Sequence, residues 1–457
     1  MGMSTWDRDL WKLWPLLLVA FSVMIIGYAG YWPAVPLSLK RFAESNSLVE
    51  SSTAHLLVEW LAKQDSIAAN DKVNADHFTV VDSASTAIPD ASAATFARPQ
   101  ITRVGPSFFC QWQVKGQSEP TSPVTIFGSW SADGERWSDP QLVFSHEGEP
   151  AATQVLALAP FLAIHNEVYT VAAVHEIVGF STSDATTFSE PKAAEMSAEF
   201  PRAVREIVGY FVRRIRSDGT LGPRITLLRR ADEVFSVAEA MRGIEIVDQP
   251  LIPDIVRRLA TADSRFGGKM EFPVPEIETD DRYRLSYPTT VAIPDNRWLR
   301  LWASEQGLDR LYGQVSPNNG VTWEKPIPTN IRNEGRFAVL EKLPSGSIFL
   351  VGNQFRTAGQ VADPLTIAIA FEKLQFTECF ELRRGAPARI RSQEPLDRRD
   401  KAEQLGFQVG GCLVDGGDVW VVYSVNAESI DVSRVRMRDL APALADSNFK
   451  IETAVRQ

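Results

Sequence analysis

The chain has 457 residues, and its 57 Asp and Glu outnumber its 47 Lys and Arg, which gives a formal net charge of -10. Hydrophobic residues make up 44% and charged residues 23%, the balance of a globular protein, so the composition excludes wholesale disorder. An acidic chain lacks the basic face that duplex DNA requires, and we expect no nucleic-acid partner. The three cysteines lie far apart and allow at most one disulfide, which excludes a fold built on disulfides.

Residues 1–40 are predicted to be a signal anchor. Residues 13–32 carry no charge, and about 20 helical residues span the hydrocarbon core of a bilayer. Trp14 and Trp32 lie near the ends of this stretch, as interfacial aromatic residues do. A cleaved signal peptide is the alternative, but no convincing cleavage site follows the apolar run. We therefore expect a single-pass protein of the cell membrane, with the rest of the chain outside the cytoplasm, in the periplasm or the extracellular space.

Residues 41–94 are interpreted as a juxtamembrane helix and a linker. The segment Asn46–Gln64 has leucines on one face and Ser47 as an N-cap, a pattern that predicts an amphipathic helix. Residues 65–94 are rich in Ala, Ser and Asp, with one strand-like run at Phe78–Val81. We expect this linker to pack at the edge of the domain that follows.

Residues 95–445 are predicted to form an all-β domain of repeated hairpins. In each hairpin, two apolar strand-like runs flank a short turn, such as Pro294-Asp295-Asn296. The hairpins span residues 98–114, 159–174, 285–304, 336–353 and 406–425. One repeated hairpin pattern predicts a β-propeller, and the length of the region gives six or seven blades of about 40 to 50 residues each. Residues 446–457 remain as a C-terminal tail.

One segment interrupts the β pattern. Residues 232–241 and 253–262 have helical periodicity, so we predict a small helical insertion at about 230–265. The acidic run at residues 276–281 is interpreted as a solvated loop.

Three short motifs follow the hairpins. Ser316–Trp323 fits the pattern Ser-x-Asp-x-Gly-x-Thr-Trp with Asn318 in the acidic place, Ser181–Phe188 fits it loosely, and Ser131–Trp137 is one residue shorter. In such a turn the Ser and Asp side chains bond to the backbone, Gly adopts a positive φ, and the aromatic residue covers the turn. Three copies at equivalent places indicate one repeated structural unit.

These motifs are Asp-boxes, and the chain resembles the sialidase-type, BNR-repeat β-propellers over about residues 95–440. Two further segments, Pro344–Asn353 and Tyr423–Val432, are similar to segments of bacterial proteins described as exo-sialidases or BNR-repeat proteins. The resemblance implies a sialidase-like propeller that acts on acidic glycans, since some relatives cleave sialic acids and others act on uronate-containing polysaccharides. Because Asp-boxes lie on the outer rim of the blades, they indicate the fold and not the chemistry.

Residues near the starts of the inner strands are the candidate substrate-binding residues, because these strands converge on the propeller axis. An arginine fork binds a carboxylate through two hydrogen bonds, which suits a carboxylated sugar. The candidates are Arg98, Gln100, Arg284, Arg336 and Gln408.

The candidate catalytic residues are Tyr287, His175 and Glu176. The resemblance implies a tyrosine nucleophile late in the chain, but Phe407 stands there, and Tyr287 is the best substitute. In uronate-acting relatives a histidine follows the first Arg-Pro, where this chain has Gln100. His175-Glu176, at the end of an apolar strand, offers another general base, although a structural strand-end histidine is the simpler interpretation. No nucleotide or metal motif is present, so we expect no cofactor.

Two hypotheses on function follow. The first is a glycoside hydrolase or polysaccharide lyase that recognises a carboxylated sugar. The second is a non-catalytic propeller that binds a glycan or a protein partner at the cell envelope, which Phe407 and Gln100 favour because neither can perform the family chemistry. A purely structural envelope protein is a third alternative, and nothing in the sequence reports an oligomeric state.

Overall fold

The computed structural model describes residues 59–60, 73–82, 84–88, 94–115, 124–145, 154–178, 204–228, 251–256, 259, 277–278, 284–304, 310–333, 337–355, 362–370, 374–388 and 406–440. All of them belong to one compact unit, Val58–Gln457. The predicted span at residues 13–32 lies outside the described residues. Within the described part of the chain, no helix is both long and apolar enough to cross a bilayer.

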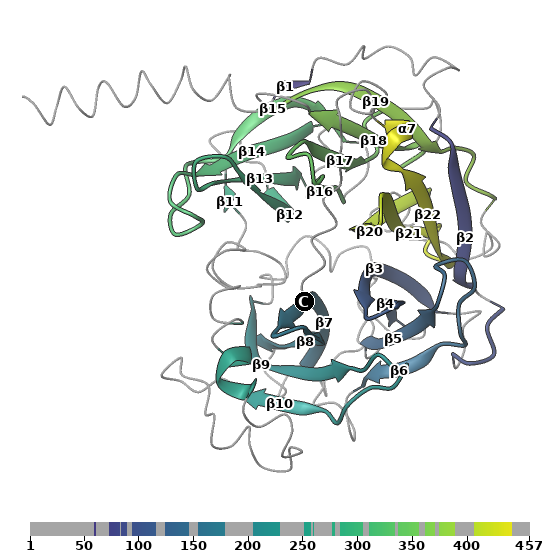
Figure 1. The fold of residues 1–457 in the computed structure, drawn as a ribbon. Coiled ribbons are helices and arrows are strands. Elements are labelled where there is room, and N and C mark those ends of the chain that lie inside the picture. Colours follow the sequence, from purple (N-terminus) through teal and green to yellow (C-terminus); the bar gives the residue numbers. More distant parts are fainter. Residues whose placement is uncertain are drawn as a thin grey trace, which may run out of the picture. The chain divides into compact units, whose positions relative to one another are not determined.

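The described residues form a five-bladed, all-β propeller (Figure 1). The first blade contains β3 (Thr95–Val104), β4 (Ser107–Lys115), β5 (Val124–Ser131) and β6 (Gln141–Phe144). The second contains β7 (Gln154–Ile164), β8 (Glu167–Val178), β9 (Val204–Ile215) and β10 (Ile225–Leu228). The third contains β11 (Ile277–Glu278), β12 (Arg284–Ile293), β13 (Arg297–Ser304), β14 (Arg310–Ser316) and β15 (Ile327–Arg332).

The last two blades each include a strand from the N-terminal part of the chain. The fourth contains β16 (Val339–Lys342), β17 (Ile348–Gly352), β18 (Leu365–Ala370) and β19 (Gln375–Arg383), with β1 (Glu59–Trp60) parallel to β19. The fifth contains β20 (Phe407–Asp415), β21 (Asp418–Val425), β22 (Ser429–Arg436) and β2 (Ala75–Asp82). A short helix, α7 (Met437–Leu440), follows β22.

The prediction of six or seven blades was wrong, because the described residues form five. The estimate divided the length of the β region by a standard blade length. The second blade alone extends from Gln154 to Leu228, and the chain between Leu228 and Ile277 contributes no described strand. The estimate had assigned this sequence to further blades.

The five predicted hairpins are confirmed. They correspond to β3–β4, β7–β8, β12–β13, β16–β17 and β20–β21, each antiparallel. The turns contain the residues that tolerate a positive φ, such as Asn166 at 69°, Asn296 at 57° and Gly417 at 93°. These short-range turn signals determine where each inner strand ends, because Asn and Gly adopt this conformation at low cost.

The strand-like run that we placed in a linker forms β2, the outermost strand of the fifth blade. Phe78 pairs with Val432, and Asp82 pairs with Ser429, in an antiparallel ladder. Val80 and Val81 are buried in the core shared by the fifth and first blades. Because β2 precedes the first blade in the sequence, its pairing joins the two ends of the propeller region. Of the predicted juxtamembrane helix, only residues 59–60 are described, and they form β1.

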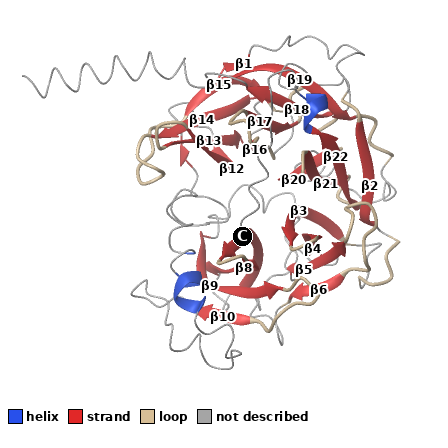
Figure 2. Ribbon diagram, in the orientation of Figure 1, coloured by secondary structure: helices blue, strands red, loops and turns tan. Residues whose placement is uncertain are grey.

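The predicted helical insertion is confirmed for residues 252–256 and 259, which are helical (Figure 2). Ile252, Ile255 and Leu259 are fully buried in the hydrophobic core of the second blade. The apolar residues whose periodicity predicted the helix therefore form the face that packs against the second blade. The segment at 232–241 lies outside the described residues.

Neighbouring blades are joined by hydrogen bonds as well as by apolar packing. The Phe96 amide of the first blade donates to the Ala427 carbonyl of the fifth, and the Phe407 amide of the fifth donates to the Ala362 carbonyl beside the fourth. The Leu340 amide of the fourth blade donates to Thr289 Oγ1 of the third at 2.8 Å. Because these contacts lie at inner strands, the strand starts have fixed positions relative to one another.

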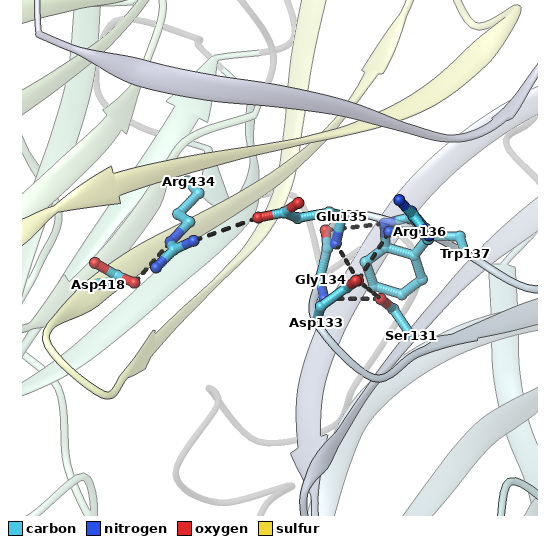
Figure 3. A network of polar contacts seen from close by, with 8 residues as sticks. All are labelled: Ser131, Asp133, Gly134, Glu135, Arg136, Trp137, Asp418 and Arg434. Atoms are coloured by element: carbon cyan, nitrogen blue, oxygen red, sulfur yellow. Dashed lines mark hydrogen bonds and ion pairs between the residues drawn. The ribbon is translucent and has the colours of Figure 1, made fainter.

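Two of the three Asp-boxes are described, and both form the expected turn. Asp133 Oδ1 accepts hydrogen bonds from the amides of Glu135 (2.8 Å) and Arg136 (2.9 Å) and from Ser131 Oγ, and Trp137 Nε1 donates to the Gly134 carbonyl. Figure 3 shows this network and its link to the fifth blade, where Arg434 lies between Asp418 and Glu135.

In the second box, Asn318 Oδ1 takes the same role. It accepts from the Thr322 amide at 2.8 Å, and Trp323 Nε1 donates to the Gly320 carbonyl. Arg300 is 2% exposed, and its guanidinium lies 3.5 Å from the centroid of the Trp323 ring. Burial lowers the pKa of Arg300 to about 10. The Ser181–Phe188 box lies outside the described residues.

The first Asp-box predicts an acid-sensitive contribution to stability. The amides of Arg136 and Glu135 lower the pKa of Asp133. A carboxylate with a lowered pKa contributes stability above its unfolded pKa of about 4, and this contribution is lost as the pH falls through the folded value. Asp133→Asn is expected to fold, since Asn318 serves in the second box, and to lose less Tm than the parent between about pH 5 and pH 2. Thermal unfolding across this range checks it, and an equal loss of Tm in both proteins would contradict it.

Candidate functional site at the starts of the inner strands

Three of the five inner strands, β3, β12 and β20, share a feature that the sequence analysis missed, a register shift near the strand start. The shift follows the third residue in β3 (after Ala97), in β12 (after Ser286) and in β20 (after Val409). In β3 and β12 the displaced residues are Arg98-Pro99 and Tyr287-Pro288, so Arg98 and Tyr287 occupy equivalent places in two blades. A bulge redirects the side chain that it displaces, and proline is tolerated there because the ladder lacks a hydrogen bond. The repeated X-Pro inside an inner strand was the signal available in the sequence.

Arg98 has an unusual backbone for a residue within a strand. Its φ is 53°, in the left-handed region that costs a side-chain-bearing residue on the order of 1 kcal/mol or more. Its guanidinium lies 5.7 Å from the centroid of the Phe337 ring, at the start of the fourth blade. β3 packs against β20 of the fifth blade, and β20 packs against β16 of the fourth, so the side chain of Arg98 extends from the first blade to the start of the fourth. This side chain therefore lies where three inner strands meet.

Gln100 lies two residues further along β3 and is held by a buried polar chain. Gln111 Nε2 donates to Gln100 Oε1 at 3.1 Å, and Thr170 Oγ1 of the second blade donates to Gln111 Oε1 at 2.5 Å. Gln111 and Thr170 are fully buried, whereas Gln100 is half-buried. With its carbonyl oxygen engaged, Gln100 can present its amide N–H groups to a ligand as hydrogen-bond donors.

The remaining binding candidates divide between described and undescribed positions. Gln408 is half-buried on β20, one residue before the register shift. Arg284 begins β12, and its backbone pairs with Glu278 of β11. Arg336 lies outside the described residues, immediately before Phe337. The structure thus brings Arg98, Gln100 and Gln408 to the starts of two neighbouring inner strands, which pack against each other.

His175 and Glu176 lie on β8, the second strand of their blade and not the innermost one. Their backbones pair with Val155 and Gln154 at the start of β7, so they lie at the same end of the blade as the strand starts. His175 is 1% exposed, which removes its ring from contact with solvent. Its role as a general base stays a prediction, as does that of Tyr287.

Phe407, which stands where a tyrosine nucleophile was expected, is a core residue. It is fully buried and packs edge-on against Tyr423, with the ring centroids 5.8 Å apart. The candidate residues whose side chains are described near the strand starts are therefore an arginine and two glutamines, which bind a carboxylate or hydroxyl groups well. No cluster of possible metal ligands occurs within the described residues.

Comparisons with known proteins concern the fold of the chain. No family model and no curated protein matches the sequence. A solved sialidase is similar with a TM-score of 0.52 and 17% identity, over 83% of this chain and 35% of that one. A mutant of the NanB sialidase from Streptococcus pneumoniae has a TM-score of 0.44 and 8% identity, over 79% of this chain and 71% of that one. A glycosyl hydrolase from Bacteroides ovatus has a TM-score of 0.39 and 10% identity, over 81% and 96%.

This chain spans about a third of the length of the first of these sialidases. At such identities the likeness concerns the fold, and it agrees with the hairpins and Asp-boxes described above. The chain has the fold of a sialidase-like β-propeller.

Proposed function

We propose that this propeller acts on acidic glycans and binds a carboxylated sugar at the starts of its inner strands. The observation that carries the proposal is the placement of Arg98, a cation in a strained backbone conformation where three inner strands meet. A strained conformation persists only where its surroundings impose it, and such residues cluster at ligand sites. Gln100 and Gln408 add hydrogen-bonding groups near it. The similar fold of a solved sialidase supports a glycan as the ligand.

In this proposal the arginine binds the sugar carboxylate, and the glutamines contact ring hydroxyls. Arg284 and Arg336 would complete the cationic set, and Tyr287, at the equivalent bulge of β12, would be the catalytic group. Hydrolysis and lyase chemistry both remain within the proposal, and their products differ.

A binding protein without catalysis is the second candidate. Among the candidate residues, Arg98, Gln100 and Gln408 are the ones with described side chains on β3 and β20 near the strand starts, and none of them transfers a proton at neutral pH. His175 is buried and Phe407 is a core residue. These placements favour a propeller that recognises an acidic glycan and leaves it intact.

The test is an assay of the full-length protein on sialylated and uronate-containing glycans, read for released sugar and for unsaturated product. Arg98→Ala is expected to reduce activity by roughly tenfold to a hundredfold, because a hydrogen-bonded charge contact contributes about 1.5–3 kcal/mol. Arg103→Ala is the matched control. Arg103 lies on the same strand at the opposite end, ion-paired with Asp415, and its replacement is expected to leave activity unchanged.

Each outcome has a defined meaning. Unsaturated product would identify a lyase, and released sugar without it would identify a hydrolase. If the folded parent is inactive but binds acidic glycans in a manner that Arg98→Ala abolishes, the second candidate is correct. Equal activity or binding in the parent and Arg98→Ala would contradict a ligand site at Arg98.

A further inference from the structure

We infer that Gly410 is a positioning residue for Arg98, because its missing side chain lets the bulge of β20 fit against the Arg98-Pro99 bulge of β3. The part of this inference that concerns ligand binding by Arg98 rests on the proposed function. The structural part, that the β20 bulge holds the β3 bulge in place, does not depend on any activity of the protein.

The space at Gly410 is too small for any side chain. A Cβ placed there would lie 2.7 Å from Pro99 N and 2.5 Å from Pro99 Cδ, and closer still to the Pro99 carbonyl oxygen. Real Cβ atoms do not approach other heavy atoms within 3.0 Å. The obstacles are backbone and ring atoms, which cannot rotate away as the end of a flexible side chain would. Gly410 does not have a positive φ, so close approach and not backbone conformation is what requires glycine here.

A change in the contact between Gly410 and Pro99 affects Arg98 through the backbone. Pro99 is buried, and its ring Cδ restricts the residue before it by steric contact, so Arg98 has few alternative conformations. Both flanks of the bulge are anchored, since the Phe96 amide bonds to the Ala427 carbonyl and Gln100 accepts from Gln111. A displacement of Pro99 therefore has to be absorbed at Arg98, the strained residue between these anchors. We expect the guanidinium to move away from Phe337 when the contact between the bulges is lost.

The neighbouring glycine provides a matched control. A Cβ on Gly411 would lie 3.4 Å from Gln100 Cα, 3.5 Å from the Pro99 carbonyl oxygen and 3.6 Å from Val422 Cγ1. These are ordinary van der Waals distances. Gly411→Ala thus makes the same chemical change one residue away without displacing Pro99.

The experiment compares the full-length parent with Gly410→Ala and Gly411→Ala. Crystal structures are expected to show the Arg98 guanidinium displaced from Phe337 in Gly410→Ala only. Hydrogen exchange of the β3 amides is expected to rise at least about tenfold in that variant, because the bulge opens locally. If the parent binds a carboxylated sugar, Gly410→Ala is expected to weaken binding at least about tenfold, since small misplacements of a positioned group have effects of this size.

The outcomes separate the two proposals. If Arg98 is displaced in Gly410→Ala and the parent binds no acidic glycan, the proposed function is overturned and the positioning role is kept. An unchanged Arg98 and unchanged exchange in Gly410→Ala would overturn the positioning role, whatever the ligand. If Gly410→Ala does not fold, Pro99→Ala provides the measurement, because it removes the ring from the same contact without adding an atom. Unchanged β3 exchange in Pro99→Ala would then overturn the inference.

Discussion

Removing β2 is expected to abolish the cooperative unfolding of the propeller. We expect a chain that begins at Val73 to fold, and a chain that begins at Ala84 to lose its sharp thermal transition. The strand pairs with β22 over most of its length and buries Val80 and Val81 to 7% and 5% exposure. Its loss would leave the apolar core between the fifth and first blades open to water.

The expected size of this effect follows from the buried area. Fully burying a valine contributes about 1.5–3 kcal/mol, and the shorter chain loses three buried valines, since Val73 is also buried. A loss of about 5 kcal/mol or more would consume much of the 5–15 kcal/mol that stabilises an ordinary domain. The unpaired edge of β22 would in addition be prone to aggregate.

Circular dichroism melts and near-ultraviolet spectra of the two chains provide the measurement. The chain that begins at Val73 serves as the control for truncation itself, because it differs from the shorter chain only in residues 73–83, which comprise β2 and the three residues that flank it. Similar melting temperatures for the two chains would show that β2 contributes little to the fifth blade.

Local features of this fold were predictable from the sequence, whereas pairings between distant segments were not. The hairpin turn at Asp295-Asn296 and the Asp-box at Asp133 depend on a few adjacent residues, and both are confirmed. The Phe78–Val81 run was recognised as strand-like, but its partner Val432 lies far along the chain. Nothing in the local pattern distinguishes a linker strand from the outer strand of the last blade.

The same distinction applies to the candidate site. Arg98 was identified because it lies near the start of an inner strand and its guanidinium suits a carboxylate. Its neighbours Phe337 and Gly410 were not identified, because their contacts with β3 cross from one blade to another. The blade count failed for a related reason, since the number of strands that pair into each sheet does not follow from the length of the region.

Arg383→Met is expected to reduce the free energy of unfolding by about 3 kcal/mol, because it breaks a largely buried ion pair. Arg383 connects the fourth and fifth blades, and its Nη1 donates at 2.5 Å to both Tyr423 Oη and Asp431 Oδ2. The Tyr423 hydroxyl also lies 2.8 Å from Ser433 Oγ, and burial raises the pKa of Tyr423 to about 12.

The cost of this substitution comes mainly from the carboxylate that remains. Asp431 is 5% exposed, so without Arg383 it would stay in the interior with one hydroxyl donor, Ser429 Oγ at 3.3 Å. Methionine keeps most of the aliphatic volume beside the Phe407 ring, so the lost charge pair and not a cavity dominates the change. The double variant Arg383→Met with Asp431→Asn is expected to recover part of the stability, since it removes the isolated charge.

Arg297→Met is the matched control, because its ion pair with Asp295 is solvent-exposed and 3.5 Å long. Exposed pairs contribute about 0–1 kcal/mol, so this variant should unfold close to the parent in a urea titration. If Arg383→Met loses no more stability than Arg297→Met, the Arg383 network does not hold the fourth and fifth blades together. If it loses much more and the double variant recovers, the junction depends on charge complementarity at Asp431. Apolar packing alone would then be insufficient to join these blades, although it fills the core between them.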